Sequence, residues 1–380
     1  MQVLKFFIPE IIFGRGSLEY AGVCARRLGA EKVLLVSDPG LERAGWVQRV
    51  TEVLEREGLK WVCYCDVVSN PRDSQIEEGA RFYCRNRADV VMAIGGGSPM
   101  DAAKGIALVA SSGGRIHDYE GANRINRPLP PMVFIPSTAG SGSDISQFAI
   151  ITDVERRVKM SIVSRTLVPN ISIIDPLILE TKSEKLIVAA AIDALCHAIE
   201  AYVSTIASPF TEVRSLQAIT LILEHLRPAI ETRSPDHFEK LSIASASSAM
   251  AFSNASLGAV HALAHSLGGM FDVLHGLVHP VLLPPVMRFN LKSCPERLAA
   301  IGDSLPGRRR RSQKAAAEAG IERIEEFCRS FGGPVRLRDL VPDRSELPEL
   351  CRMALNDICL LTNPRPASLE DLLGICEKAW

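Results

Sequence analysis

The sequence lacks an excess of charge of either sign and any long uninterrupted apolar run. Its 43 Lys and Arg residues against 44 Asp and Glu residues give a formal net charge of −1, so no overall charge attracts it to nucleic acid or anionic lipid. No apolar run reaches the roughly 18 residues needed to span a bilayer. We therefore expect neither a nucleic acid nor a membrane as a partner.

Paired cysteine motifs are also missing. The ten cysteines are scattered and only Cys63 and Cys65 lie close together, which excludes the spacing of a zinc knuckle and the density of a disulfide scaffold. Residues 1–16 have a Pro-Glu break in their apolar run and no small-residue cleavage site, so we expect a first strand rather than a signal peptide. The four arginines at 308–311 are interpreted as a solvated loop. These features predict a protein of the reducing cytoplasm.

The first half of the chain alternates strand-like and helix-like segments. Apolar segments typical of strands buried on both faces occupy residues 32–38, 59–68, 88–98 and 132–138, and helical patterns occupy residues 44–57 and 74–87. Strands of this kind separated by helices predict a parallel sheet with right-handed crossovers. Residues 148–163 are expected to form a hairpin with its turn at 153–157.

After about Leu179 nearly every segment has helical periodicity. Helices are expected over residues 183–203, 208–226, 237–256 and 312–331. A chain of 380 residues is long for a single core, which favours two domains. The sequence therefore predicts an α/β N-terminal domain over residues 1–180 and an all-α C-terminal domain over residues 181–380.

A glycine-rich turn follows the third expected strand and opens a helix in "AIGGGSPMDAAKGIA", residues 93–107. The three glycines allow a ligand to approach the backbone, and the first N–H groups of the helix can bind a pyrophosphate. The segment matches neither the Rossmann fingerprint nor a P-loop, so a tight structural turn is the alternative.

Two further features of the same half concern nucleotide binding. Asp38 ends the first expected strand, where a carboxylate can accept hydrogen bonds from a ribose 2′-hydroxyl and repel a 2′-phosphate, or can simply stabilise a turn. Residues 136–146 form a loop rich in hydroxyls that can wrap a nucleotide or serve as a flexible connection. Two such loops in one half favour nucleotide binding.

The second half concentrates groups that bind metals. Asp193 and His197 lie four residues apart in an apolar helix, so they share a face and can form a buried hydrogen bond or hold a metal together. Four of the eight histidines lie within nineteen residues: His261, His265, His275 and His279. We expect the first two to share one helix face and the last two another, with Gly268-Gly269 breaking the chain between them. Several imidazoles and a carboxylate suit Fe(II) or Zn(II), although spacing does not say which histidines are ligands.

The chain resembles the iron-containing (group III) alcohol dehydrogenase family over essentially its whole length. The segments that carry the resemblance are "GGGSPMDAAKGIA", "STAGSGSD", "ITD…VKM", "AIDALCHAIEAY", "HALAHSLGG…HGLVHPVLLPPVMRFN" and "TNPRPAS". It implies the dehydroquinate synthase-like architecture, with a nucleotide-binding domain at 1–180, a metal-binding and catalytic domain at 181–380 and the site in the cleft between them. It also implies a homo-oligomer, a dimer or larger.

Residue roles follow from the resemblance. The metal ligands would be Asp193, His197, His261 and His275. His265 would lie beside the nicotinamide and the substrate, and His279 would be an outer or structural residue. The cofactor contacts would be Asp38, Gly96, Gly97, Ser98, Thr138, Ser146 and Lys159. The pocket candidates Phe148, Phe252 and Cys359 come from the resemblance as well, and core packing explains the two phenylalanines equally well.

This chain departs from the family in two places. Ser137, Ser141, Asp144 and Ser146 stand where Thr, Thr, Glu and Thr are commoner. These changes keep a hydroxyl or a charge. The segment 190–192 replaces an approach to the metal helix that commonly contains Gly.

The function implied is a metal-dependent, NAD(H)-linked oxidoreductase that interconverts a short primary alcohol or diol and its aldehyde. Fe(II) is the expected ion and Zn(II) the alternative; either would lower the pKa of the alcohol. His265, or a water that it orients, would carry the proton. The alternative is that His265 is a ligand and that Asp193 only orients His197. The rival functions are a zinc-dependent glycerol dehydrogenase-like or dehydroquinate synthase-like enzyme and a catalytically silent nucleotide-binding assembly component.

Overall fold

The computed structural model of the chain describes residues 5–304 and 312–380. The arginine run at 308–311 and the first four residues of the expected N-terminal strand lie outside the described residues. Within the remainder of that expected strand, only Glu10–Phe13 (β1) is extended in a sheet.

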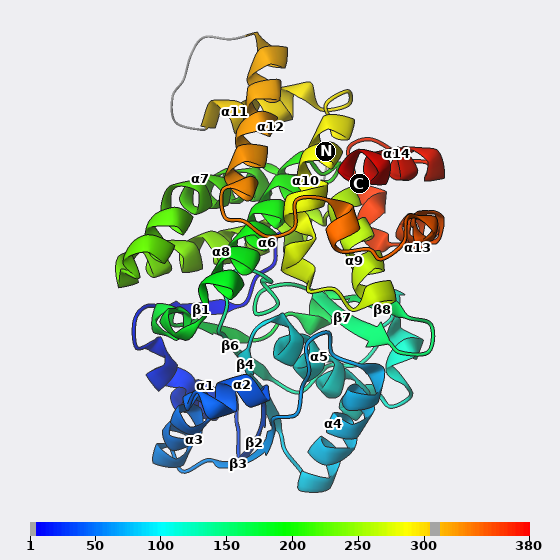
Figure 1. Cartoon of the computed structure of the whole chain (residues 1–380). Helices are drawn as coiled ribbons and strands as arrows, with labels where there is room; N and C mark the ends of the chain where they lie inside the picture. The colour runs from blue at the N-terminus through cyan, green and yellow to red at the C-terminus, as the bar shows by residue number, and fades with distance from the viewer. Residues whose placement is uncertain (1–4, 305–311) are drawn as a thin grey trace. The chain divides into compact units, whose positions relative to one another are not determined.

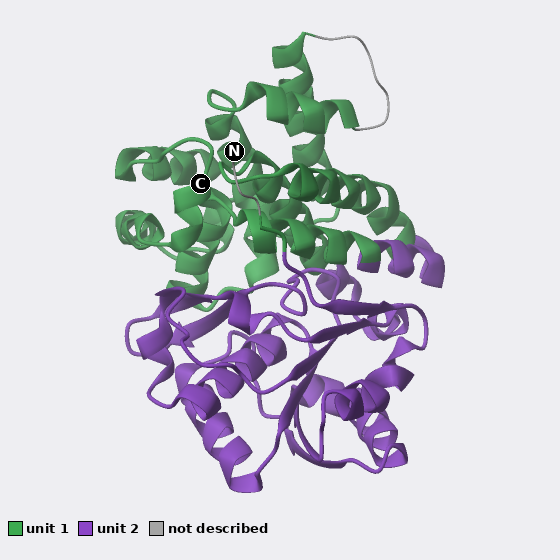
Figure 2. Cartoon of the chain, turned by 180° about the vertical axis from the view of Figure 1, so that it is seen from behind, with its two compact units in different colours: residues 1–6, 188–230, 243–380 green, residues 7–187, 231–242 purple. Residues whose placement is uncertain are grey.

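The chain forms two compact units, which Figure 2 shows in separate colours. The α/β unit comprises residues 7–187 and 231–242, and the helical unit comprises residues 1–6, 188–230 and 243–380. The fold class expected from the sequence is confirmed. The division into domains 1–180 and 181–380 stays a prediction.

The α/β unit is built on a six-stranded parallel sheet with the order β1-β9-β6-β4-β2-β3. Its strands after β1 are Lys32–Val36 (β2), Lys60–Tyr64 (β3), Val90–Gly95 (β4), Met132–Pro136 (β6) and Ile171–Ile174 (β9). The predicted strands at 32–38, 88–98 and 132–138 are therefore present, and the one predicted at 59–68 is shorter. Cys63 and Cys65, at the end of β3, are joined by a disulfide.

Alternating side chains of the strands face two layers of helices. Val33 and Leu35 pack with the layer formed by α1 and α3, whereas Leu34 and Val36 pack with the layer formed by α4 and α5. Figure 1 shows these helices on opposite sides of the sheet. The helices of this unit are Ala21–Arg27 (α1), Pro39–Arg43 (α2), Trp46–Arg56 (α3), Asp73–Asn86 (α4) and Gly97–Ser112 (α5). Because both faces are covered, the strands read as continuous apolar runs in the sequence.

The expected hairpin is present as Phe148–Asp153 (β7) and Val158–Val163 (β8), which pair in antiparallel fashion. Gly121–Ala122 (β5) joins β8 to complete a second, three-stranded sheet. At the turn, Oδ1 of Asp153 accepts a hydrogen bond of 2.9 Å from the backbone N–H of Arg156. The turn therefore falls within the predicted residues.

The chain from Glu184 onward is mainly helical. Its α-helices are Glu184–Val203 (α6), Pro209–Thr232 (α7), Pro235–Ala255 (α8), Ala259–Phe271 (α9), His279–Asn290 (α10), Pro295–Ser304 (α11), Gln313–Arg329 (α12), Leu347–Leu355 (α13) and Leu369–Ala379 (α14). Among the described residues, α6 alone is long and apolar enough to cross a membrane, but 83% of its apolar window is buried inside the protein. Most of α6 is therefore covered by the rest of the protein.

The break expected at Gly268-Gly269 is wrong, because α9 continues through both glycines to Phe271. The residue that follows the helix, Asp272, is its C-cap and adopts a left-handed conformation with φ of 52°. His275 and His279 consequently do not share one α-helix. His275 begins the 3₁₀ helix η5 (His275–Leu277), and His279 begins α10.

Candidate metal centre and nucleotide site

Four imidazole rings surround one carboxylate oxygen in the helical unit. Helix α6 places Asp193 and His197 one turn apart, and the Nε2 atom of His197 lies 3.6 Å from Oδ1 of Asp193. The Nε2 atoms of His261, His275 and His279 lie 3.6, 3.9 and 3.5 Å from the same oxygen. One donor atom from each of Asp193, His261, His275 and His279 lies within 4.8 Å of the other three.

These donors fit a divalent metal ion. Asp193 and His261 are buried, and neither Oδ1 of Asp193 nor Nε2 of His261 has a hydrogen-bond partner among the described residues. Such atoms are costly to bury unless something else satisfies them. Separations of 3.5–3.9 Å are also close to the roughly 3–3.5 Å between neighbouring ligands whose bonds to a metal are about 2.1 Å. The side chain of His275 is 26% exposed, the most open of the group, so the centre faces outward past His275.

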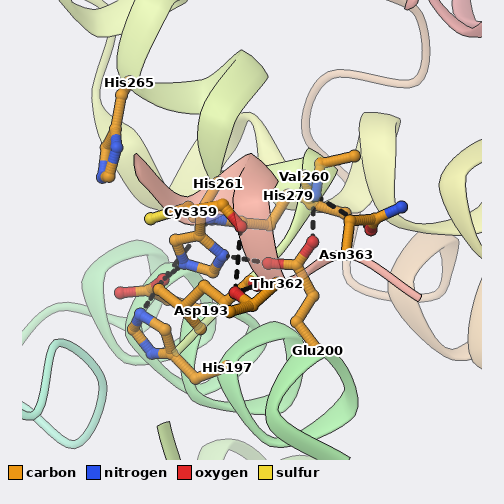
Figure 3. Close-up of polar contacts among 12 residues, drawn as sticks. Asp193, His197, Glu200, Val260, His261, His265, His279, Cys359, Thr362 and Asn363 are labelled. Atoms are coloured by element: carbon orange, nitrogen blue, oxygen red, sulfur yellow. Dashed lines mark hydrogen bonds and ion pairs between the residues drawn. The ribbon is translucent and has the colours of Figure 1, made fainter. Parts of the chain in front are cut away.

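A second carboxylate holds His261 from the opposite side. Oε2 of the buried Glu200 lies 2.6 Å from Nδ1 of His261, and Oε1 accepts a hydrogen bond of 2.7 Å from the backbone N–H of Val260. Figure 3 shows Asp193 and Glu200 on opposite sides of the His261 ring. Burial by itself lowers the pKa of His261, but the two carboxylates outweigh burial and raise that pKa to about 9. With a metal bound, the Glu200 contact keeps the proton on Nδ1 and leaves Nε2 to the ion.

The pKa of Asp193 is held below its ordinary value. Burial raises this pKa, and the neighbouring His197 and His261 more than offset burial. The carboxylate is therefore an anionic donor at neutral pH, as a divalent ion requires.

Close backbone contacts bring the histidine-bearing segments together. A Cβ at Gly276 would lie 2.6 Å from the carbonyl oxygen of Ala189, so only glycine lets η5, which carries His275, approach α6 this closely. A Cβ at Gly258 would lie 2.7 Å from Oδ1 of Asn363 and 2.9 Å from Oε1 of Glu200. Gly258 therefore allows α9, which carries His261, to start against both side chains.

The segment "TNPRPAS" fixes the start of α9. Oδ1 of Asn363 accepts a hydrogen bond of 3.2 Å from the backbone N–H of Ala259, the first residue of α9. The hydroxyl of Thr362 donates a hydrogen bond of 2.6 Å to the carbonyl of Leu257. This motif from the far end of the chain thus positions His261.

His265 lies one turn beyond His261 and has a different partner. Its Nδ1 lies 2.8 Å from Oδ2 of Asp357, whose Oδ1 accepts a hydrogen bond of 2.8 Å from the backbone N–H of Cys359. The ring of His265 stacks on that of His275 at 5.4 Å. Burial raises the pKa of Asp357, but the adjacent His265 outweighs burial and lowers it below the ordinary value. Asp357 is thus an anion that orients the His265 ring.

Sequence reasoning missed both Glu200 and Asp357. Glu200 follows His197 by three residues in "AIDALCHAIEAY", so its place near the same helix face was readable. Asp357 gave no such signal, because it lies 92 residues from His265 in the sequence.

In the α/β unit, the two loops expected to bind a nucleotide lie against each other. The backbone N–H of Ser137 donates a hydrogen bond of 2.7 Å to the carbonyl of Gly95, where β4 ends. A Cβ at Gly97 would lie 3.0 Å from Cβ of Ser141, and one at Gly96 would lie 3.6 Å from Thr138. The glycines therefore allow close packing of the loops, and Gly96 is the N-cap of α5.

The other expected cofactor residues occupy varied surroundings. Oδ1 of Asp38 caps α2 by accepting hydrogen bonds of 2.8 and 3.0 Å from the backbone N–H groups of Gly40 and Leu41, as in the turn alternative. The hydroxyl of Ser98 accepts a hydrogen bond of 3.2 Å from the backbone N–H of Asn70. Ser146 is buried, and Lys159 is half-buried in β8. The structure brings Gly96, Gly97 and Thr138 together, whereas the proposed roles of all these residues stay predictions.

A buried lysine attaches the second loop to α5. Nζ of Lys104 donates hydrogen bonds of 2.8 and 2.6 Å to the carbonyls of Ser146 and Phe148. Burial lowers the pKa of Lys104 to about 8, although Asp101 and Asp144 act in the opposite direction. No sequence pattern indicated this role for Lys104.

Two family models together match nearly the whole chain. The family model described as iron-containing alcohol dehydrogenase matches residues 9–176, and the model of the C-terminal region of the Fe-containing alcohol dehydrogenase family matches residues 187–380. The chain belongs to the iron-containing alcohol dehydrogenase family. The resemblance found in the sequence is thereby confirmed.

Individual members of the family match over nearly the whole chain. The NAD-dependent methanol dehydrogenase of Bacillus methanolicus is 36% identical over 381 residues, covering 99% of both chains. The 1,3-propanediol dehydrogenase of Klebsiella pneumoniae is 36% identical over 387 residues, covering 100% of this chain and 99% of its own. A crystal structure of a 1,3-propanediol oxidoreductase matches with a TM-score of 0.96 at 36% identity, and each chain is covered completely.

The three residues expected to line the substrate pocket are all buried in this member of the iron-containing alcohol dehydrogenase family; they are Phe148, Phe252 and Cys359. The ring of Phe252 stacks on His197 at 4.3 Å, so it supports an expected ligand. Phe148 lies at the start of β7, where its carbonyl accepts from Lys104. Burial raises the pKa of the Cys359 thiol well above its ordinary value, so this cysteine is a neutral thiol beside Asp357. Contact of these three residues with substrate stays a prediction.

Proposed function

We propose that this protein is an NAD(H)-linked alcohol dehydrogenase. It interconverts a short primary alcohol or diol and its aldehyde at a divalent iron held by Asp193, His197, His261 and His275. The observation that carries the proposal is the group of imidazole nitrogens at 3.5–3.9 Å around one buried carboxylate oxygen. The names of the methanol and 1,3-propanediol dehydrogenases that match the whole chain support the substrate class.

A divalent ion, when bound, lowers the pKa of an alcohol and polarises an aldehyde carbonyl. The protein's own residues supply the metal donors and the proton carrier. Asp193 and three imidazoles provide the donors, and Glu200 fixes the tautomer of His261 through Nδ1. His265 carries the proton at Nε2, because Asp357 engages its Nδ1 and orients the ring. Asp357 is therefore a positioning residue for the proton carrier.

The nicotinamide cofactor is assigned to the two packed loops of the α/β unit. Its pyrophosphate is expected at the N-terminus of α5, which offers unpaired backbone N–H groups to an anion. The proposed contacts are Asp38, Gly96, Gly97, Ser98, Thr138, Ser146 and Lys159. The acidic Asp38 favours NAD(H) over NADP(H), since a carboxylate repels a 2′-phosphate.

The proposal includes three further expectations, which concern the roles of the two domains, the location of the protein and its oligomeric state. The nucleotide-binding function is assigned to residues 1–180 and the metal-binding function to residues 181–380. Apart from the Cys63–Cys65 disulfide, the cysteines lack the spacing of a disulfide scaffold, which supports a cytoplasmic location. The family resemblance supports a homo-oligomer.

The rival functions are less well supported. Membership of the iron-containing family does not favour a zinc-dependent glycerol dehydrogenase-like or dehydroquinate synthase-like enzyme. The donors gathered around Asp193 argue against a catalytically silent assembly component.

The test is metal analysis of the purified protein together with a rate screen. Short alcohols, diols and aldehydes are tested with NAD(H) and NADP(H). We expect one divalent iron per chain and NAD-dependent turnover of a short alcohol. Protein that binds no divalent metal, or that turns over none of these substrates when loaded, would contradict the proposal.

A further inference from the structure

His279 has the same spatial relation to Asp193 as the three histidines proposed as ligands. Its Nε2 lies 3.5 Å from Oδ1 of Asp193, slightly nearer than the corresponding atoms of His197, His261 and His275 at 3.6–3.9 Å. His279 is completely buried, and its ring lies 4.8 Å from that of His261 and 4.6 Å from that of His275. It therefore lies inside the cluster.

A residue that only supports a metal ligand would contact the nitrogen of that ligand that faces away from the metal. Glu200 illustrates that role, since it contacts the far nitrogen of His261 at 2.6 Å. The 3.5 Å between His279 and Asp193 is longer than the 2.7–3.2 Å of an N–H···O hydrogen bond, yet it matches the separation between two ligands of one ion. One ring nitrogen of His279 also belongs with Asp193, His261 and His275 to the group of donors that are mutually within 4.8 Å.

The backbone fixes this position. Gly276 allows η5 to contact Ala189 of α6, and α10 begins at His279 with Pro280 in its first turn. These contacts hold the His279 ring within the cluster.

We propose that His279 is a fifth protein ligand of the metal, which gives a donor set of one carboxylate and four imidazoles. This inference rests on the proposed metal site and extends it, because the family resemblance leaves His279 outside the ligand set. Five protein donors exceed the four of a tetrahedral zinc site and suit an ion that accepts six ligands, such as Fe(II). Such an ion retains a single position that the protein does not fill.

The test uses the full-length protein loaded with Co(II), whose visible bands weaken as the number of ligands rises. The wild-type protein is expected to show the weak bands of a five- or six-coordinate ion. In His279→Leu the bands are expected to become stronger and to shift. Fe(II) affinity, measured by competition with a chelator, is expected to fall by more than the roughly 10–100-fold that loss of an outer partner produces. The control is His237→Leu, which removes a histidine at the start of α8. It should change neither the Co(II) bands nor the Fe(II) affinity.

A second measurement needs no variant, in case His279→Leu does not fold. In the proton NMR spectrum of the Co(II)-loaded wild type, each coordinated imidazole contributes one exchangeable, strongly shifted N–H signal. We expect four such signals. Three signals, or an unchanged Co(II) spectrum and Fe(II) affinity in folded His279→Leu, would overturn the inference while leaving the proposed function intact. Failure of the wild type to bind Co(II) or Fe(II) would overturn both.

Discussion

The carboxylate of Glu200 and the imidazole of His261 are joined by a contact of 2.6 Å between Oε2 and Nδ1, and both side chains are buried. The other oxygen of Glu200 is engaged by the backbone N–H of Val260. Since the two partners come from α6 and α9, this contact both joins the helices and sets the proton on the far side of His261 from Asp193. Metal binding at Nε2 should depend on it.

Replacing Glu200 by Gln should weaken metal binding without unfolding the protein. The amide still accepts from Val260 but does not stabilise the Nδ1 proton of His261 as a carboxylate does, so affinity for Fe(II) should fall by about 10–100-fold. Chelator competition measures this change. Glu212→Gln, in α7 beside Arg297, is the control and should leave the affinity unchanged. Equal affinities in both variants would remove Glu200 from the metal centre.

His261→Ala should abolish metal binding and nearly all turnover, since it removes a proposed ligand at the middle of the cluster. Metal content after purification and the rate with a short alcohol check this expectation. His237→Ala is the matched control. Normal metal content in His261→Ala would show that the ligand assignment is wrong.

His265 and Asp357 should affect turnover and not metal content. In His265→Ala the metal should remain bound while kcat falls, and in Asp357→Asn the pH dependence of kcat should shift because the ring loses its anionic partner. Asp193→Ala serves as the comparison and should lose the metal. Loss of metal from His265→Ala with retention in Asp193→Ala would reverse the assignment of ligand and proton carrier.

Asp38→Gly should narrow or reverse the preference for NAD(H) over NADP(H). The variant removes the negative charge expected near the 2′ position of the ribose. The ratio of kcat/KM for the two cofactors is the measurement. Lys182→Met should strengthen the preference for NAD(H), because it removes a positive charge near Asp38. The two groups are close enough to interact: burial lowers the pKa of Lys182, and Asp38 offsets part of this effect. Equal use of both cofactors by the wild type would count against the assignment of Asp38.

Because of Lys104, the free energy of unfolding of the wild type should depend on pH in the alkaline range. Its pKa is lowered by burial from 10.5 to about 8 in the folded protein, so the unfolded chain binds more protons between these values. The free energy of unfolding, compared with that of Lys104→Met, should therefore rise with pH between about 8 and 10.5, by up to about 3 kcal/mol. Below pH 8 the difference should be constant. Urea unfolding of both proteins across this range measures it, and a flat difference would mean that Lys104 titrates normally.

The sequence alone determined the elements whose residues interact locally. The apolar run of β2 and the periodicity of α6 are properties of neighbouring residues, so both were predicted nearly at their observed bounds. The spacing of Asp193 and His197 placed them on one helix face for the same reason. The motifs also determined the family, because they occur in order along the whole chain.

Only the tertiary structure decided which distant residues meet. Glu200 and His261 are 61 residues apart and Asp357 and His265 are 92 apart, and no local pattern encodes contacts between helices so far apart in the chain. The same holds for His279, whose place in the cluster follows from the packing of η5 against α6 at Gly276. The expected break at Gly268-Gly269 was wrong for a related reason. Glycine weakens a helix by only about 1 kcal/mol per residue, and the packing of a buried helix such as α9 can offset that amount.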